Sequence, residues 1–414
     1  MEDKKIKVLL INSFFHVEGG ADTAFFNTAE LLEKKGHDVI YFCMDHPLNK
    51  TTRFSSYFVS NIDFQRPMSF WKSIKATLRL FWSFEANHKL GKLIEREKPN
   101  LAHIHNIFYE LSPSIIRTIK KFNIPIVMSL HDYGLVCPLR LMFRKNSICE
   151  ECKNGGFLAI IKNRCIRNSF SASLIVYLSF QFHNKMLKTF DLVDIFIAPS
   201  RFLKSIFEKM GFTKKIAYLQ NFIEVEKYYP HFSHKNKNIA FVGRLQEIKG
   251  IEVLVEAVKG LEVNLKIIGR GPFEDALKQK VRKEHISNIE FLGYLSLDEM
   301  NRVMKDIMFT VVPSIWYEVL GFVIIESFAW GKPVIASRIG GISELVIDNE
   351  NGLLFMPGDV EDLRKKINHL LNHPERVMEM GRKAREWVEQ NSNSVTNYSK
   401  TLILYSELLV QKRT

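Results

Sequence analysis

Short apolar runs, each followed by a longer amphipathic stretch, recur along the first half of the chain. Each run has the length of a strand buried in a sheet, and the intervening stretches repeat their apolar residues at helical spacing. The runs span residues 7–12, 39–44, 101–105, 126–130 and 195–198, and the clearest helical stretch spans residues 21–35. Alternation of strands with helices is typical of a parallel sheet, so residues 1–220 are predicted to form one α/β domain.

The same alternation starts again after residues 219–237, where Pro, His, Lys and Asn cluster with little periodicity. The predicted strands span residues 238–242, 264–268, 289–292, 308–312 and 334–336, and the predicted helices span 251–258, 273–284 and 322–330, with further helices between 359 and 409. A chain of 414 residues also exceeds the usual size of a single core. A second α/β domain is therefore predicted over residues 221–395, followed by a final helix at 396–414.

Residues 69–96 are predicted to form one helix with two unlike sides. The apolar side contains Phe70, Trp71, Ile74, Leu78, Phe81 and Trp82, and the opposite side contains Lys72, Lys75 and Arg79. An amphipathic helix of a globular protein usually packs its apolar side on a core. A basic helix with exposed tryptophan residues can instead lie in a membrane interface. Both interpretations stay open from the sequence.

The positive charge of the chain is concentrated in its first half. The net charge is +13, and residues 1–220 contain 32 Lys and Arg residues against 19 Asp and Glu residues. In residues 221–414 the two kinds balance at 26 each. A basic half attracts polyanions such as anionic lipid headgroups, phosphorylated substrates or nucleic acid. No nucleic-acid recognition motif is present, so no nucleic-acid partner is predicted.

Membrane-spanning and exported segments are not predicted. No apolar run reaches the roughly 18 residues that a bilayer-crossing helix needs. The N-terminal residues MEDKKIKVLLIN fit a first strand better than a signal peptide. The protein is therefore expected in the cytoplasm.

Polar residues follow several predicted strands at the edge where α/β sheets bind ligands. In the first half, Gly19 and Gly20 precede a helix whose first N–H groups can bind an anion, and His131 directly follows a strand. In the second half, Arg244 follows a strand and Lys249 lies five residues further on. An arginine and a lysine at one edge can neutralise a diphosphate, and no Walker-type motif suggests phosphoryl transfer.

Two carboxylates eight residues apart lie near the same edge of the second predicted sheet. Glu318 belongs to an aromatic loop after the strand at 308–312, and Glu326 belongs to the helix at 322–330. A loop acid and a helix acid at this edge can both face one ligand. A carboxylate such as Glu326 is also a suitable acceptor for two ribose hydroxyls.

Four of the five cysteines lie close together in the sequence. Cys137, Cys149, Cys152 and Cys165 have the spacing C-x11-C-x2-C-x12-C, within a basic segment of weak periodicity. This spacing is typical of a structural four-cysteine zinc site, and disulfides are rare in the cytoplasm. Reduced cysteines that only pack are the alternative. Cys43 lies in a predicted strand and is expected in the core.

The motifs of the second half resemble those of a known family when they are taken together. GRLQEIKG at 243–250 resembles the G-R-L-x-x-x-K-G element of the retaining glycosyltransferases of family 4, and PSIWYEVLGFVIIESFAWGKPVIAS at 313–337 resembles their E-x7-E element. FLGYLS at 291–296, IGGISELVIDNENGLLFMPGD at 339–359 and the early segment 19–39 also fit. LHDYGLVCP at 130–138, with the four cysteines, resembles a subset of that family.

The resemblance implies the GT-B fold, in which two Rossmann-like domains face each other across a cleft and the C-terminal helix crosses back to the first domain. It also implies that a sugar moves, with retention, from a UDP- or GDP-linked donor to an acceptor hydroxyl. Arg244 and Lys249 are implied to hold the diphosphate, Glu326 the ribose, and Glu318 and His131 the donor sugar at the reacting centre. The donor-binding set is completed by Gly19, Gly20, Val319, Leu320, Gly321 and Phe322. No catalytic divalent metal is implied, because the two cations stabilise the leaving group.

The chain departs from the family pattern at two places. Asn221-Phe222-Ile223-Glu224 replaces the usual N-G-[VI]-D, and Val319-Leu320-Gly321-Phe322-Val323 alters the small residues after Glu318. The second departure leaves the identity of the donor sugar open. Two alternatives to a transferase are a non-catalytic GT-B subunit that tethers a partner to the membrane and a GT-B epimerase or phosphorylase.

The basic, aromatic first half suggests where the acceptor lies. A lipid-linked or growing glycan acceptor is expected, in the synthesis of a surface polysaccharide such as capsule, O-antigen or exopolysaccharide. The protein is then expected to be peripheral to the inner face of the cell membrane, bound to an anionic surface.

Overall fold

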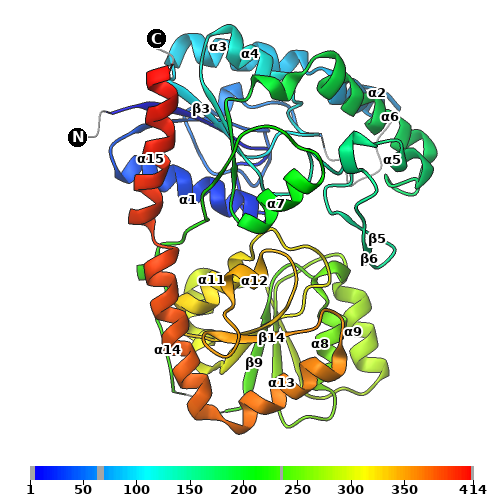
Figure 1. The fold of residues 1–414 in the computed structure, drawn as a ribbon, viewed down its shortest axis with the longest axis vertical. Helices are drawn as coiled ribbons and strands as arrows, with labels where there is room; N and C mark the ends of the chain where they lie inside the picture. The colour runs from blue at the N-terminus through cyan, green and yellow to red at the C-terminus, as the bar shows by residue number, and fades with distance from the viewer. Residues whose placement is uncertain (1–4, 63–69, 234–235, 412–414) are drawn as a thin grey trace.

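The structure consists of two α/β domains, one above the other in Figure 1. It is a computed structural model, and it describes residues 5–62, 70–233 and 236–411. Each domain contains one parallel sheet flanked by helices, so the predicted fold class is confirmed.

The N-terminal domain is built on a six-stranded parallel sheet with the order β2-β1-β3-β4-β7-β8. Its strands are β1 (Lys7–Ile11), β2 (Asp38–Phe42), β3 (Leu101–Ile104), β4 (Ile126–Ser129), β7 (Ile195–Ala198) and β8 (Ile216–Tyr218). The principal helices are α1 (Gly20–Lys34), α2 (Phe70–Phe81), α3 (Phe84–Glu97), α4 (Ile115–Lys121), α6 (Phe170–Gln181) and α7 (Arg201–Lys209). All residues of β3, β4 and β7 are buried, as expected for parallel strands covered on both faces.

The C-terminal domain repeats this plan with the strand order β11-β10-β9-β12-β13-β14. Its strands are β9 (Asn238–Val242), β10 (Asn264–Ile268), β11 (Ile289–Gly293), β12 (Phe309–Val312), β13 (Val334–Ser337) and β14 (Gly352–Phe355). Its helices are α8 (Ile251–Val258), α9 (Glu274–Lys283), α10 (Leu297–Val303), α11 (Phe322–Ala329), α12 (Ile342–Leu345), α13 (Val360–Asn372) and α14 (Pro374–Asn391). In each sheet the strand order reverses beside the first strand of the domain, β1 or β9. A reversal of this kind places a ligand-binding crevice at the carboxyl ends of the strands.

The ten predicted strands are all present, with ends that agree within two residues. The sequence pattern does not predict the two edge strands, β8 and β14. Only Ile216 of β8 is fully buried, so its apolar signal is weak. The β14 strand begins at Gly352, directly after an asparagine, and this dipeptide is typical of a turn.

The prediction of one helix over 69–96 is wrong. Residue 69 lies outside the described residues, and the rest forms two helices, α2 and α3, that are separated at Trp82 and Ser83. Ser83 has an extended backbone, and its side chain accepts a hydrogen bond from the N–H of Ala86. The serine therefore caps a new helix rather than continuing the old one.

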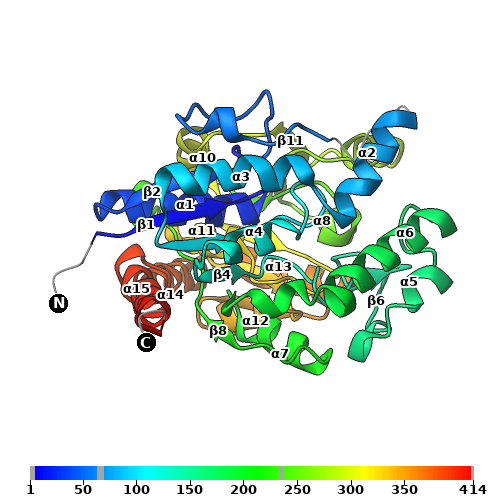
Figure 2. The same ribbon diagram turned by 90° about the horizontal axis from the view of Figure 1, so that it is seen from above.

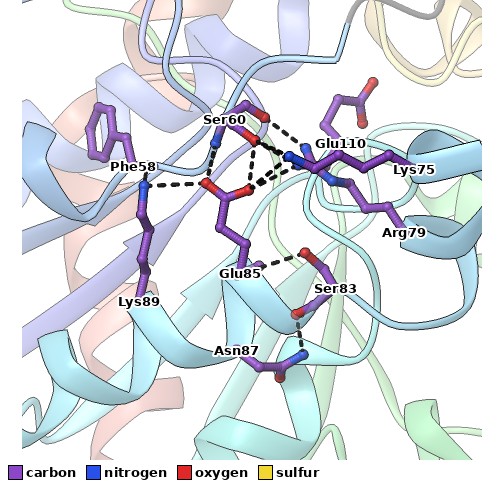
Figure 3. Close-up of polar contacts among 10 residues, drawn as sticks. Phe58, Ser60, Lys75, Arg79, Ser83, Glu85, Asn87, Lys89 and Glu110 are labelled. Carbon is purple, nitrogen blue, oxygen red and sulfur yellow. Dashed lines mark hydrogen bonds and ion pairs between the residues drawn. The ribbon is translucent and has the colours of Figure 1, made fainter. Parts of the chain in front are cut away.

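The prediction that Arg79 lies on the basic side of this segment, away from the core, is also wrong. The guanidinium of Arg79 is buried. It donates to the carbonyl oxygens of Ser60 and Glu110 and lies 3.2 Å from the carboxylate of Glu85 (Figure 3). Glu85 also accepts from the N–H and hydroxyl of Ser60. Although burial opposes the effect, these hydrogen bonds and Lys89 hold the pKa of Glu85 below its ordinary value. Arg79 thus ties α2 to the domain instead of facing solvent.

The C-terminal helix α15 (Ser394–Gln411) leaves α14 and runs along the N-terminal domain (Figure 1). The hydroxyl of Tyr398 lies 2.8 Å from Nε2 of His37, and that of Tyr405 lies 2.7 Å from Nδ1 of His103. Tyr398, Tyr405 and Leu408 are buried in the core of the N-terminal domain. The last helix of the chain therefore completes the first domain.

None of the helices in residues 5–62, 70–233 and 236–411 combines the length and the apolar character needed to cross a membrane.

Candidate active site

Loops at the carboxyl ends of the two sheets are in direct contact. The hydroxyl of Tyr133, four residues after β4, donates to the carbonyl oxygen of Tyr317, 3.0 Å away in the loop after β12. The hydroxyl of Ser200, after β7, donates to the carbonyl oxygen of Val319 at 2.5 Å. Trp316 of the same loop is buried in the hydrophobic core of the N-terminal domain. The loop that carries Glu318 is thus held between the two domains.

Glu318 is almost fully buried and makes an ion pair with Lys249. Its Oε1 lies 2.6 Å from Nζ of Lys249 and also accepts hydrogen bonds from the Ser314 hydroxyl and the Trp316 indole, at 2.7 and 3.0 Å. Burial raises the pKa of a carboxyl, but Lys249 and these two donors outweigh it and lower the pKa of Glu318. Glu318 is therefore an ionised carboxylate whose Oε1 is already occupied by protein groups.

Glu326 lies in the second turn of α11 and is half-buried. The hydroxyl of Tyr228 is 3.4 Å from its Oε1. Burial raises the pKa of Glu326 to about 7, and the Tyr228 hydrogen bond only partly opposes this. Unlike Glu318, Glu326 has no cation beside it within the described part of the chain. Glu326 can accept hydrogen bonds from a ligand once it is ionised.

Arg244 and Lys249 lie on the segment between β9 and α8. The Arg244 side chain is exposed, and it has no hydrogen-bond or ion-pair partner within the described part of the chain. Lys249 ends a short 3-10 helix, Glu247–Lys249, and its side chain is 26% exposed. One cation is thus free to bind a ligand anion, and the other is held in place by Glu318.

The N-terminus of α1 lies against α11 of the other domain. A Cβ atom added at Gly20 would be 3.1 Å from Cδ2 of Phe322, the first residue of α11. The N–H of Gly19 is already used, because it donates to the carboxylate of Asp22 at 3.0 Å. Of the two predicted glycines, Gly20 is the one at the helix terminus next to the second domain.

His131 stacks on a second histidine that the sequence analysis missed. Its Nε2 lies 3.0 Å from Nδ1 of His105, and the two rings are 5.1 Å apart and nearly parallel. His105 in turn lies beside His103, with 4.4 Å between the ring centres. Burial lowers the pKa of His131 to about 4 and that of His103 to about 3, and it lowers the pKa of His105 as well. All three imidazoles are therefore neutral at neutral pH.

The residues after Glu318 form the turn into α11. The carbonyl oxygen of Val319 accepts from Ser200, Leu320 is buried, and Gly321 has a φ of 102°, which favours glycine. Gly340 packs so closely on Glu318 that an added Cβ would lie 2.5 Å from its carbonyl oxygen. The shape of this turn is therefore fixed from both sides.

A contact between the domains that the sequence analysis missed involves Glu344 of α12. Its carboxylate accepts hydrogen bonds from the backbone N–H groups of Arg201, at 2.9 Å, and Phe202, at the N-terminus of α7. An acid at a helix N-terminus is favourable because it satisfies free N–H groups and the helix dipole. No spacing in the sequence indicates this pair, because 142 residues separate Glu344 from Phe202.

The four clustered cysteines are brought together in the segment between β4 and α6. Cys137 and Cys152 are buried, Cys149 and Cys165 are half-buried, and none of them forms a disulfide. Cys43 is buried elsewhere, after β2. In the described residues, no group of three or more His, Cys, Asp or Glu side chains has the arrangement needed to hold a metal ion.

Two family models match consecutive parts of the chain. The model described as Glycosyltransferase Family 4 matches residues 18–227, and the one described as Glycosyl transferases group 1 matches residues 226–387. The two matches meet near residue 226, between the two sheets.

Two relatives illustrate how far the similarity extends. An uncharacterized glycosyltransferase of Methanocaldococcus jannaschii is 40% identical over 152 residues, which are 37% of this chain and 43% of that protein. An uncharacterized 42.6 kDa protein in the cps region of Klebsiella pneumoniae is 24% identical over 391 residues, which are 87% of this chain and 96% of that protein. The chain thus spans less than half of the first relative and nearly all of the second.

The fold is similar to that of Anabaena Alr3699/HepE, whose structure contains UDP-glucose. The TM-score is 0.69 at 17% identity, over 97% of this chain and all of the other. At this identity the likeness concerns the fold alone, and it confirms the predicted GT-B architecture.

Proposed function

The chain belongs to glycosyltransferase family 4, and from this we propose that it is a retaining hexosyltransferase that moves a sugar from a nucleotide-diphosphate donor to an acceptor hydroxyl. One observation carries the proposal most directly. The N-terminus of α1, at Gly20, lies against α11, the helix that carries Glu326. An anion-binding helix terminus and a ribose-binding carboxylate therefore belong to two elements in contact.

The donor diphosphate binds beside Arg244, Lys249 and the N-terminus of α1 in this proposal. The exposed Arg244 supplies a planar fork for phosphate oxygens, and Lys249 supplies a point charge with N–H groups to spare beyond Glu318. These cations stabilise the negative charge that develops on the leaving diphosphate, which lowers the barrier to transfer. Glu326 accepts the ribose hydroxyls.

Glu318 acts on the reaction through Lys249 in this proposal. Three protein donors share its Oε1, so this carboxylate holds the ammonium of Lys249 at the diphosphate. His131, which is neutral and half-buried, faces the donor sugar as a hydrogen-bonding group rather than as a charged acid. The N–H and C=O groups of the turn from Val319 to Phe322 line the same sugar.

The acceptor in this proposal is a lipid-linked or growing surface polysaccharide. The relative that spans nearly the whole chain is named for a cps region, which supports this class of product. Elements α2 and α6 are neighbours at one end of the N-terminal domain (Figure 2). Both carry exposed apolar side chains. Trp71 is 78% exposed, Leu78 is 61% exposed, and Leu178 of α6 is 46% exposed. Exposed lysines in the same region, Lys75 and Lys185, suit anionic lipid headgroups, which supports the proposed position at the inner face of the cell membrane.

The activity is tested by incubating the purified chain with UDP- and GDP-sugars and measuring nucleotide release. Release is expected with one donor, and the configuration of the product, read from its anomeric proton by NMR, is expected to match the donor. No release, together with no binding of any donor by calorimetry, contradicts the proposal and favours a non-catalytic tethering subunit.

Membrane binding is tested separately, by flotation with vesicles that contain phosphatidylglycerol. Binding is expected at low salt and weaker binding at high salt. The double change Trp71→Gln and Leu78→Gln is expected to abolish it, whereas Tyr294→Gln, an exposed aromatic in the other domain, is not. Equal binding by the unchanged chain, the double variant and Tyr294→Gln rules out this surface as the membrane contact.

A further inference from the structure

The four clustered cysteines surround one small cavity. Cys137, Cys149, Cys152 and Cys165 all line it, and its volume is about 20 Å³. A space of this size holds a single water-sized particle. The remaining cavity wall includes Arg144 and apolar side chains from the same segment. Residues that are far apart in the segment have therefore been folded around one point.

Backbone hydrogen bonds bring the first two cysteines of the cluster close together. The N–H of Arg140 donates to the carbonyl oxygen of Cys137 at 2.7 Å, which closes a tight turn. The N–H of Cys149 donates to the carbonyl oxygen of Met142, just after this turn, at 2.8 Å. The backbone therefore holds Cys149 beside the turn that carries Cys137.

The segment that carries the cysteines is poor in regular structure. Its hairpin strands, β5 (Phe143–Arg144) and β6 (Ser147–Ile148), have two residues each, and its helix α5 (Ala159–Lys162) has four. Eight of the fourteen non-glycine residues with positive φ in the described chain lie here. They are Arg140, Met142, Lys145, Asn146, Asn154, Arg164, Arg167 and Asn168. Such conformations persist only where other interactions fix the backbone.

We propose that Cys137, Cys149, Cys152 and Cys165 together bind one structural zinc ion. In this structure the four sulfur atoms do not yet form a ligand group, so binding requires their side chains to turn toward the shared cavity. Four thiolates fill the tetrahedral coordination of zinc and leave no position for substrate. The ion therefore cross-links the segment and takes no part in sugar transfer.

The position of this site gives the ion a second effect. Glu150 lies between two of the ligands, and its carboxylate accepts from the Tyr317 hydroxyl at 3.3 Å and pairs with Lys209 at 2.5 Å. Tyr317 directly precedes Glu318. The zinc-bound turn thus supports the loop that holds Lys249, although it lies outside the candidate active site.

The direct test is the metal content of the full chain, purified without chelators and analysed by inductively coupled plasma mass spectrometry. One zinc ion per chain is expected. Replacing Cys149 and Cys152 together by serine is expected to abolish zinc binding. The matched control Cys43→Ser, which changes the one cysteine outside the cluster, is expected to keep the full zinc content.

A second measurement covers the case in which the double variant does not fold. The wild-type chain is unfolded in the presence of a zinc-sensitive dye, and its free thiols are counted after the metal is removed. Release of one zinc and detection of five thiols are expected. Bound iron in place of zinc, a disulfide within the cluster, or metal-free protein that stays metal-free when zinc is added would each overturn the proposal. None of these outcomes depends on whether the chain transfers a sugar.

Discussion

The ammonium of Lys249 lies 2.6 Å from Oε1 of Glu318, a buried carboxylate that also accepts hydrogen bonds from Ser314 and Trp316. Changing Lys249 to alanine is therefore expected to have two effects. It removes a cation from the diphosphate, which is expected to lower turnover about 100-fold or more. It also leaves the Glu318 charge without its cation, which is expected to cost about 3 kcal/mol of stability.

A double variant separates these two effects of Lys249→Ala. Adding Glu318→Gln removes the uncompensated charge, so the free energy of unfolding in urea is expected to recover. Turnover is expected to stay low, because no cation returns to the diphosphate. Recovery of both properties in the double variant is incompatible with a direct role of Lys249 at the diphosphate.

Glu326 is predicted to make donor binding pH-dependent near neutrality. Its pKa in the folded protein is about 7, and only the ionised form accepts two ribose hydroxyls. Affinity for a nucleotide sugar is therefore expected to rise about tenfold from about pH 6 to about pH 8. A nucleotide sugar is used rather than a free nucleotide, because its esterified diphosphate does not titrate in this range. In Glu326→Gln, affinity is expected to be weaker and flat with pH.

The same carboxyl is predicted to lower stability at alkaline pH. The pKa of Glu326 is raised on folding from 4.5 to about 7, so the folded state binds this proton more tightly than the unfolded state. Stability contributed by this proton is present below pH 4.5 and is lost as the pH rises through about 7. Glu326→Gln is therefore expected to raise Tm at about pH 8 and to leave it nearly unchanged at about pH 4. An equal shift at both pH values would show that the effect is not electrostatic.

A branched side chain at Gly20 is predicted to weaken donor binding. The added Cβ of Gly20→Ala lies 3.1 Å from the Phe322 ring, so the ring has to shift by a few tenths of an ångström, and Gly20→Val adds two more methyl groups there. Donor affinity measured by calorimetry is expected to fall at least about tenfold in the valine variant, since small displacements weaken oriented contacts strongly. Gly91→Ala in α3, where the new Cβ has only a contact at 4.0 Å, serves as the control.

His105 is predicted to position His131. Replacing His105 by phenylalanine keeps an aromatic ring beside His131 but removes the 3.0 Å hydrogen bond to its Nε2. We expect kcat to fall about tenfold with little change in KM, because the ring of His131 is no longer held. Stability is expected to change little, because Nε2 of His105 is a buried atom without a partner, which the substitution removes.

A double-mutant cycle decides whether His105 acts through His131. The effect of His105→Phe on kcat is expected to vanish in a chain that already carries His131→Phe. If the two losses add, His105 affects turnover by another route.

The alternation of short apolar runs with helical stretches was enough to predict both sheets, because buried parallel strands leave a strong and local signal. The candidate residues that come just after such strands, His131 and Arg244, were accessible to the same reasoning. Motif spacing added Lys249, Glu318 and Glu326. The roles of these residues remain predictions for the experiments above.

The missed features depend on contacts between distant parts of the chain. The pairing of His105 with His131 follows from the register of β3 beside β4, and the contact of Glu344 with α7 follows from the docking of the two domains. Arg79 was placed on a solvent-facing side because helical spacing alone does not show that Ser60 and Glu110 approach it. Periodicity carries no information about any of these partners.

The return of α15 to the N-terminal domain has a consequence for how the protein folds during synthesis. Tyr405 fills the core beside His103, but 302 residues separate the two in the chain. Domains generally fold as units as they emerge from the ribosome. Here the first domain can only close its core after the entire second domain has been made, so a nascent chain stalled before residue 394 is expected to expose an unfinished apolar surface to chaperones.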